Sequence, residues 1–255
     1  MKTNYHTHTT RCKHAYGSDE EYVLEAIAAG YDQLAFTDHA PWPQHPFEHS
    51  LIRMDVTQIE DYIQSISALK EKYKSQIDIK IGFESEYFRD RMDWMASIVD
   101  QYQLDLLVFG NHFRDFDIPK QYYGNYHDLS KIYDHYLEDA VDGMRSGLFK
   151  IFAHPDLYNR TLKKWDQPAQ EVAHQICKVA LETNVVLEYN LGGVRYNDGS
   201  YPYHGFWEIA ALYQNPTIIG VDAHRPIHLS DETIRKQAIQ VCKQLHVNLI
   251  DSIEW

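Results

Sequence analysis

Histidine is the residue type whose number and placement first suggest chemistry, with 15 copies in 255 residues. Six of these histidines, together with two carboxylates, directly follow short apolar runs of the kind that form buried strands. Imidazole and carboxylate groups are donors that first-row divalent metal ions accept in proteins. The residues at the ends of these runs are His6, His8, His39, Glu84, His112, His154, Asp222 and His224.

The spacing within these motifs suits metal binding. His6 and His8 are two residues apart, so in an extended segment both side chains point to the same side and can bind one ion. Asp222 and His224 have the same spacing and can face neighbouring ions. Glu84 has two carboxylate oxygens and can bridge adjacent cations. These patterns predict a shared metal centre rather than separate surface histidines.

The number of donors predicts more than one metal ion. The loop before the first helix adds His14, for which a solvated role is the alternative. Seven histidines and two carboxylates exceed the roughly four to six donors that one first-row ion accepts. We therefore expect two or three divalent ions, with Zn, Mn and Fe all open because no thiolate belongs to the set. Pro155 is expected to keep the preceding His154 in extended backbone.

Strands alternate with helices along the chain, and these elements must position the donors. Ser18 with Glu21 forms a capping-box pattern, Asp166 with Pro168 predicts another helix start, and Ser230 is expected to begin the last helix. The expected strands are 2–5, 33–37, 77–83, 104–110, 150–153, 185–189 and 217–221.

About seven strand–helix units favour a closed or nearly closed β/α barrel. The C-terminal ends of the strands converge on one face of such a barrel, and the active site lies there. A doubly wound open sheet is the alternative, although no GxGxxG motif follows the first apolar run. No linker or low-complexity tract divides the sequence, so residues 1–255 are expected to form a single domain.

Composition excludes several classes of protein. The net charge of −13 argues against a nucleic-acid binder, and no apolar run approaches the ~18 residues of a membrane span. Three cysteines without a CxxC pair argue against a disulfide framework and, with no apparent signal peptide, favour a cytoplasmic protein.

The strand-end motifs resemble those of the PHP (polymerase and histidinol phosphatase) family of metal-dependent phosphoesterases, in the same order along the whole chain. Within the family, the sequence motifs are most similar to those of the stand-alone histidinol-phosphate phosphatases at Phe36–Pro41, Ala153–Leu157 and Asp222–Pro226. The motifs are His6-Thr-His8, Thr37-Asp38-His39, Gly82-Phe83-Glu84, Asn111-His112, Ala153-His154-Pro155-Asp156 and Asp222-Ala-His224.

This resemblance implies a distorted (β/α)7 TIM-like barrel that hydrolyses L-histidinol phosphate to L-histidinol and inorganic phosphate. By hypothesis, hydroxide bridging two ions attacks phosphorus, Glu84 is the bridging ligand, and Asp222 or a metal-bound water protonates the leaving oxygen. The resemblance implies a first metal held by His6, His8, Glu84 and Asp222, a second by Glu84, His112 and His154, and a third by His14, His39 and His224.

A phosphate substrate also needs cationic partners. Arg160 follows the strand that ends before His154, and Arg195 follows the 185–189 strand, which ends in no obvious metal donor. We expect both arginines to bind phosphate, because the guanidinium fork matches two phosphate oxygens.

Two other functions remain open at this point. One is a related phosphatase with another substrate, such as protein phosphotyrosine, which requires an open, shallow site. The other is a non-catalytic metal-binding barrel, in which Arg160 and Arg195 would not reach the metal face. The sequence leaves the oligomeric state open.

Overall fold

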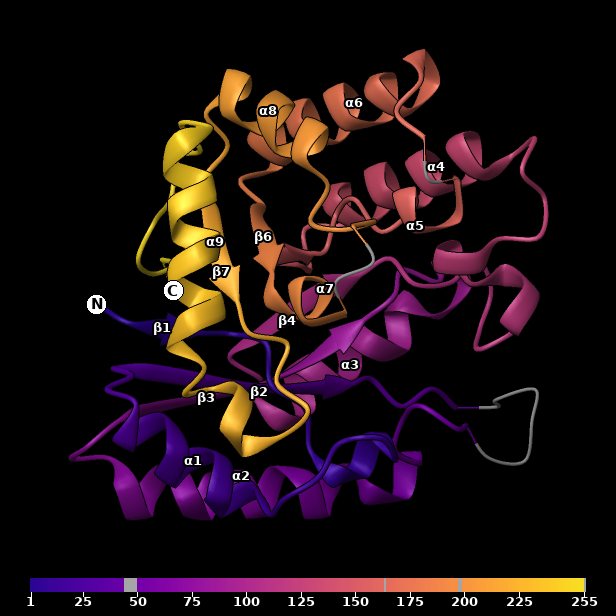
Figure 1. The fold of residues 1–255 in the computed structure, drawn as a ribbon. Coiled ribbons are helices and arrows are strands. Elements are labelled where there is room, and N and C mark those ends of the chain that lie inside the picture. Colours follow the sequence, from indigo (N-terminus) through magenta and orange to yellow (C-terminus); the bar gives the residue numbers. More distant parts are fainter. Residues whose placement is uncertain (44–49, 163, 197–198, 255) are drawn as a thin grey trace.

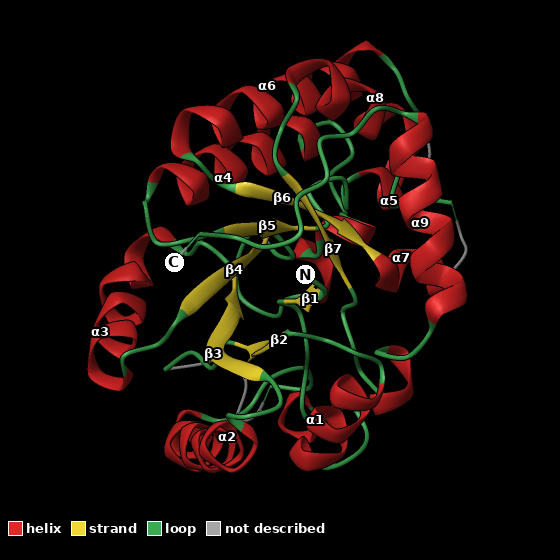
Figure 2. Ribbon diagram, turned by 90° about the vertical axis from the view of Figure 1, so that its left-hand side faces the viewer, coloured by secondary structure: helices red, strands yellow, loops and turns green. Residues whose placement is uncertain are grey.

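Seven parallel strands form one sheet whose spatial order follows the chain, in a computed structural model that describes residues 1–255 except 44–49, 163, 197–198 and 255. Helices surround the strands, so the predicted β/α barrel is confirmed (Figure 2). The strands are β1 (Thr3–Asn4), β2 (Gln33–His39), β3 (Asp78–Ser85), β4 (Leu106–Gly110), β5 (Ile151–Ala153), β6 (Val186–Asn190) and β7 (Thr217–Gly220).

The helices alternate with the strands and lie outside them (Figure 1). Ser18 and Glu21 form the expected capping box, and the Asp166 side chain accepts a hydrogen bond from the Ala169 amide. The last helix begins one residue later than expected, because Asp231 rather than Ser230 caps it. The helices are α1 (Asp19–Ala28), α2 (Ile59–Tyr73), α3 (Met92–Tyr102), α4 (Ile132–Arg145), α5 (Asn159–Leu162), α6 (Gln167–Thr183), α7 (Leu191–Tyr196), α8 (His204–Tyr213) and α9 (Glu232–Gln244).

Apolar side chains cover both faces of the sheet. All seven residues of β2 are buried, with Leu34 and Phe36 in the large cluster that includes the surrounding helices. Ala35 belongs to a separate small cluster with Val108 and Ile151 from neighbouring strands. This burial on both faces explains why the strands are nearly continuous apolar runs in the sequence.

The seam between β1 and β7 is closed next to the strand ends. Thr7 and Ala223 form an isolated parallel bridge, in which the His8 amide donates to the Ala223 carbonyl at 2.9 Å and the Ala223 amide to the His6 carbonyl at 3.2 Å. Across this bridge, His8 Nε2 lies 3.3 Å from Asp222 Oδ1, and the His8 and His224 rings are stacked with centroids 4.2 Å apart. The bridge therefore brings His6 and His8 beside Asp222 and His224.

Asn4 ties this seam together from within β1. Its Oδ1 accepts a hydrogen bond from the Val221 amide at 2.8 Å, and its Nδ2 donates to Thr7 Oγ1 at 2.8 Å and to the His6 carbonyl at 3.1 Å. Asn4 is fully buried.

Among the described residues, no helix combines the length and the apolar character that crossing a membrane requires.

Replacing Asn4 with alanine is expected to lower the free energy of unfolding by about 1–3 kcal/mol, because the Val221 amide loses its buried acceptor. Urea denaturation measures this change. The control is Asn248→Ala, since Asn248 makes an exposed hydrogen bond to the Gln214 carbonyl. Equal stability losses in the two variants would contradict a special role for Asn4.

Candidate metal centre

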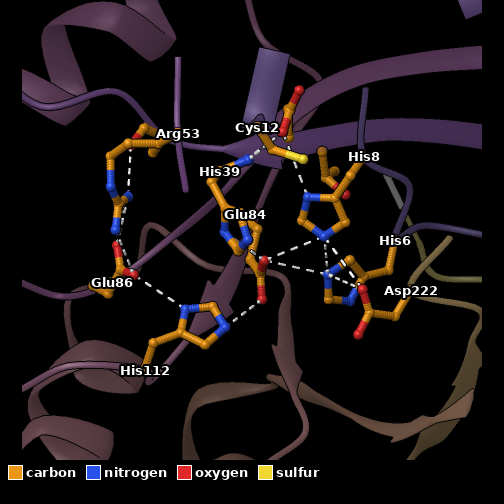
Figure 3. A network of polar contacts seen from close by, with 12 residues as sticks. His6, His8, Cys12, His39, Arg53, Glu84, Glu86, His112 and Asp222 are labelled. Atoms are coloured by element: carbon orange, nitrogen blue, oxygen red, sulfur yellow. Dashed lines mark hydrogen bonds and ion pairs between the residues drawn. The ribbon is translucent and has the colours of Figure 1, made fainter. Parts of the chain in front are cut away.

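Glu84 lies at the middle of the donor cluster, with imidazole rings on several sides (Figure 3). Its side chain is 1% exposed. Its Oε2 atom lies 3.3 Å from His6 Nε2, 3.5 Å from His8 Nε2 and 3.0 Å from His39 Nδ1. One carboxylate oxygen thus faces donors from the ends of β1 and β2.

The other oxygen of Glu84 faces a different pair of rings. Oε1 lies 3.2 Å from His112 Nε2 and 3.0 Å from His154 Nε2. Because the two oxygens face separate sets of imidazoles, Glu84 has the geometry of a carboxylate that bridges two cations. His6 and His8 face one oxygen and His112 and His154 the other, but His39, which the resemblance assigns to the third metal, also lies against Glu84 Oε2.

Asp222 completes the group that contains His6 and His8. Its Oδ1 atom lies 3.6 Å from His6 Nε2 and 3.3 Å from His8 Nε2, and the two Nε2 atoms are 3.1 Å apart. Ligand atoms of these three residues all lie within 4.8 Å of one another. Such a group can hold one ion.

A third group lies towards the rim of the site. His14 Nε2 is 2.9 Å from His224 Nε2, and the His14 and His39 rings are stacked with centroids 5.5 Å apart. His14 is exposed, but its position against His224 differs from that of an isolated solvated histidine. The structure thus brings together all nine donors named from the sequence.

Cys12 also lies close to this third group, although the sequence indicated no thiol in the set. Its sulfur lies within 4.8 Å of ligand atoms of His14 and His224. Burial raises the pKa of the Cys12 thiol far above its ordinary value, so the group stays protonated near neutral pH. Without a metal ion, the third group therefore has a neutral thiol beside its imidazole donors.

Unpaired polar atoms in the cluster fit bound cations. Glu84 Oε2 and His39 Nδ1 are buried and 3.0 Å apart, yet neither has a hydrogen-bond partner among the described residues. Buried polar atoms are rarely left in this state. Ligand atoms of His39, Glu84 and His112 lie within 4.8 Å of one another, so one cation could satisfy them together.

Two further carboxylates orient the ligating rings. Glu188 Oε2, from β6, lies 2.9 Å from His6 Nδ1, and Glu86 Oε1 lies 3.0 Å from His112 Nδ1. Burial alone would raise the pKa of Glu86, but Arg53 and His112 outweigh it and lower the pKa to about 2. Each carboxylate holds the Nδ1 proton of its ring and leaves Nε2 for the metal. Neither role was expected from the sequence, although a glutamate within a buried strand is a usable signal for Glu188.

Local electrostatics keep the central carboxylates ionised. Burial tends to raise the pKa of Glu84, but His112 and His6 outweigh it and hold that pKa well below its ordinary value. Asp222 behaves in the same way, with burial outweighed mainly by His6 and His224. Ionised carboxylates are the form that binds metal.

Backbone geometry at the strand ends is specialised for this cluster. His154 and Asp222 have φ angles of +34° and +51°, in a region that non-glycine residues rarely adopt. The expectation that Pro155 keeps His154 extended is therefore wrong.

Gly110 lies so close to the donor side chains that no larger residue fits there. A Cβ at this position would lie 2.6 Å from Glu84 Oε1 and 2.5 Å from His112 Cε1.

A cavity of about 750 Å³ opens above the metal donors. Arg160 lines it, and its Nη1 donates to the Tyr122 hydroxyl at 3.2 Å. Tyr122 is a candidate that the sequence analysis did not single out. Other lining residues include Phe113, Asp117, Asn125, Leu157, Tyr196 and Tyr201.

Arg195 takes a different position from the one we expected. It is not among the described residues that line the cavity. Its Nη2 donates to the backbone carbonyls of Val221 and Asp222, at 2.9 Å in the second case. This geometry lets Arg195 hold the backbone of Asp222. Its Nη1 is buried and has no hydrogen-bond partner among the described residues, so the binding of phosphate by Arg195 stays a prediction.

Comparison with known proteins identifies relatives of this fold and site. The model of the PHP domain family matches residues 4–191. A probable histidinol-phosphatase of Deinococcus radiodurans is 29% identical over 227 residues, which cover 87% of this chain and 85% of the relative. The histidinol-phosphatase of Bacillus subtilis is 26% identical, and the match covers 88% of this chain and 94% of that relative.

A solved structure has the same fold. The histidinol phosphate phosphatase of Lactococcus lactis, crystallised with zinc, L-histidinol and phosphate, superposes with a TM-score of 0.74. The two chains are 18% identical, and the match covers 100% of this chain and 99% of that one.

Glu84→Gln is expected to lower metal affinity by at least about 10–100-fold, the loss typical even of an outer partner of a ligand. The amide keeps the size of the side chain but removes the charge shared by two ligand sets. Metal content per chain, measured after dialysis, tests the effect, and circular dichroism checks the fold. A folded variant with undiminished metal content would show that Glu84 is not a bridging ligand.

Proposed function

The chain belongs to the PHP domain family, and we propose that it is a metal-dependent phosphomonoesterase that hydrolyses L-histidinol phosphate to L-histidinol and inorganic phosphate. The observation that carries this proposal is the joint placement of the bridging carboxylate Glu84 and the cation Arg160 on one cavity. The curated relatives named above, both called histidinol-phosphatases, support the substrate.

The metal donors supply one half of the catalytic machinery. Divalent ions bound here, with Zn, Mn and Fe all compatible with the nitrogen and oxygen donors, would make water a better nucleophile and offset phosphate charge. His6, His8 and Asp222 would hold one ion, with Glu84 shared. His112 and His154 would hold the second, and His14, His39 and His224 the third.

Residues on the cavity wall supply the other half. Arg160 can donate two parallel hydrogen bonds to phosphate oxygens. The Tyr122 hydroxyl accepts from Arg160 and keeps its own proton to donate to a substrate oxygen. Asp222, held ionised by its histidine neighbours, is better suited to bind metal than to protonate the leaving group. Asp222 and Glu84 therefore act as ligands in this proposal.

The shape of the site favours a small substrate over a protein phosphotyrosine. His8 and Glu84 line the cavity and are each only 1% exposed. Phe113 and Tyr201 add aromatic surface to its wall, and aromatic faces attract organic cations such as the ammonium of histidinol. A bulky protein surface would have difficulty reaching donors this deep.

The setting of the enzyme follows from the same features. We infer that residues 1–255 act as one catalytic domain, since the donors range from His6 to His224. We also infer a cytoplasmic location, supported by the three cysteines, which are all free and buried. The net charge of −13 supports a small substrate rather than nucleic acid.

A panel of phosphate esters tests the proposed substrate. The metal-loaded protein is expected to hydrolyse L-histidinol phosphate with a kcat/KM at least about 10-fold above that for phosphotyrosyl peptides, and chelation is expected to abolish turnover. Released phosphate is the readout. Comparable or higher activity on the peptides would overturn the proposed substrate, and full activity after verified metal removal would overturn the mechanism.

Paired arginine variants test the division of roles. Arg160→Ala is expected to raise KM about 30-fold, the effect of losing roughly 2 kcal/mol of charged hydrogen bonding, with metal content unchanged. Arg195→Ala is expected to lower metal content instead, because Asp222 loses a backbone support. Steady-state kinetics and metal analysis separate the two. A raised KM with unchanged metal content in Arg195→Ala would instead show that Arg195 binds phosphate.

A further inference from the structure

Arg53 is a buried cation for which the proposed chemistry gives no role. It precedes α2 in the chain, and its side chain is 1% exposed. A guanidinium buried this deeply requires anionic or carbonyl partners for its donors. These partners lie on three different segments that each follow a strand.

The guanidinium connects the ends of β2, β3 and the loop after β4. Its Nη1 donates to the Ala40 carbonyl at 2.7 Å. Its Nη1 and Nη2 donate to the two oxygens of Glu86 at 3.1 and 3.0 Å. Its Nε donates to Asp117 at 3.0 Å, and Nη2 also contacts that carboxylate.

Each of these three partners is close in sequence to a metal donor. Ala40 follows His39 directly, Glu86 is two residues after Glu84, and Asp117 is five residues after His112. Ligand atoms of His39, Glu84 and His112 lie within 4.8 Å of one another. One side chain therefore joins the three segments that carry this donor group.

The connection to His112 is the most direct. Glu86 Oε1 accepts both from Arg53 Nη2 at 3.0 Å and from His112 Nδ1 at 3.0 Å (Figure 3). Glu86 Oε2 accepts hydrogen bonds from Arg53 Nη1 and Trp42 Nε1. The carboxylate that orients His112 is thus itself fixed by a two-pronged pair with Arg53.

We propose that Arg53 is a positioning residue for the metal subsite formed by Glu84 Oε1, His112 and His154, which we call the His112 subsite. It acts through Glu86, which turns His112 Nε2 towards Glu84. The inference rests on the proposed metal centre but not on the identity of the substrate. Lysine cannot replace this arginine, since a single ammonium cannot span Ala40, Glu86 and Asp117.

Arg53→Lys keeps the buried positive charge but removes the guanidinium group that donates to several acceptors at once. The variant is expected to lose one metal ion per chain relative to the unaltered protein, with at least 10-fold weaker binding of that ion. The ions held by the remaining donors are expected to stay. Titration of the metal-free proteins with Zn²⁺, followed by calorimetry and metal analysis, provides a measurement that does not depend on activity.

The matched control is Arg114→Lys. Arg114 lies in the same loop after β4 and pairs with Glu138 and Asp139 at 2.7 and 2.5 Å, without contacting the described metal donors. Both lysine variants weaken an arginine that holds two carboxylates, but only Arg53→Lys is expected to lose an ion. Loss of the same ion in both variants, or in neither while both are folded, would overturn the proposal.

Glu86→Gln tests the route by which Arg53 acts. This variant is expected to lose the same ion, and the double variant Arg53→Lys/Glu86→Gln is expected to bind Zn²⁺ no more weakly than the weaker single variant. Additive losses would show that Arg53 does not act through Glu86. If Arg53→Lys fails to fold, Glu86→Gln alone decides, because a folded Glu86→Gln protein that retains every ion contradicts the proposal.

Failure of this inference is distinguishable from failure of the proposed function. A protein that binds all its ions but does not hydrolyse L-histidinol phosphate would contradict the substrate and leave the role of Arg53 untouched. If the unaltered protein is fully active but its Arg53→Lys variant keeps all ions, the role of Arg53 is contradicted and the proposed substrate stands.

Discussion

The buried carboxylate of Glu84, surrounded by five imidazoles, is the interaction on which the structure of the site depends. A buried charge is costly unless it is paired. Neighbouring imidazoles cannot all carry a proton without repelling one another. Cations placed between the ring nitrogens and the carboxylate oxygens satisfy both groups at once. The donor cluster therefore makes physical sense as a site for metal ions more than as a hydrogen-bond network.

The barrel makes such a cluster possible by delivering one or two donors from each of several strands. Parallel pairing brings His39 beside Glu84, and the Thr7–Ala223 bridge brings the β1 and β7 motifs together. Strained backbone at His154 and Asp222 then aims side chains that regular strands would direct elsewhere. The rest of the fold stabilises these local conformations.

A series of polar contacts runs outward from the centre of the site. The anionic Glu84 faces His112, His112 donates to the anionic Glu86, and Glu86 pairs with the cationic Arg53. Arg53 in turn holds Asp117, which lines the substrate cavity. Arg53 thus has an anionic partner on either side, Glu86 and Asp117, and the series connects the metal donors physically to the wall of the cavity.

The sequence by itself determined the barrel and named the side chains that the structure gathers into one cluster, because apolar runs and the two-residue alternation of strands are local patterns. The expected strand boundaries differ from the observed ones by only a few residues. Tertiary structure decided how the donors divide around Glu84, why Arg195 binds backbone, and which carboxylates meet Arg53. Those contacts join segments far apart in the chain through long side chains, whose direction depends on how the loops fold and leaves no periodic signal in the sequence.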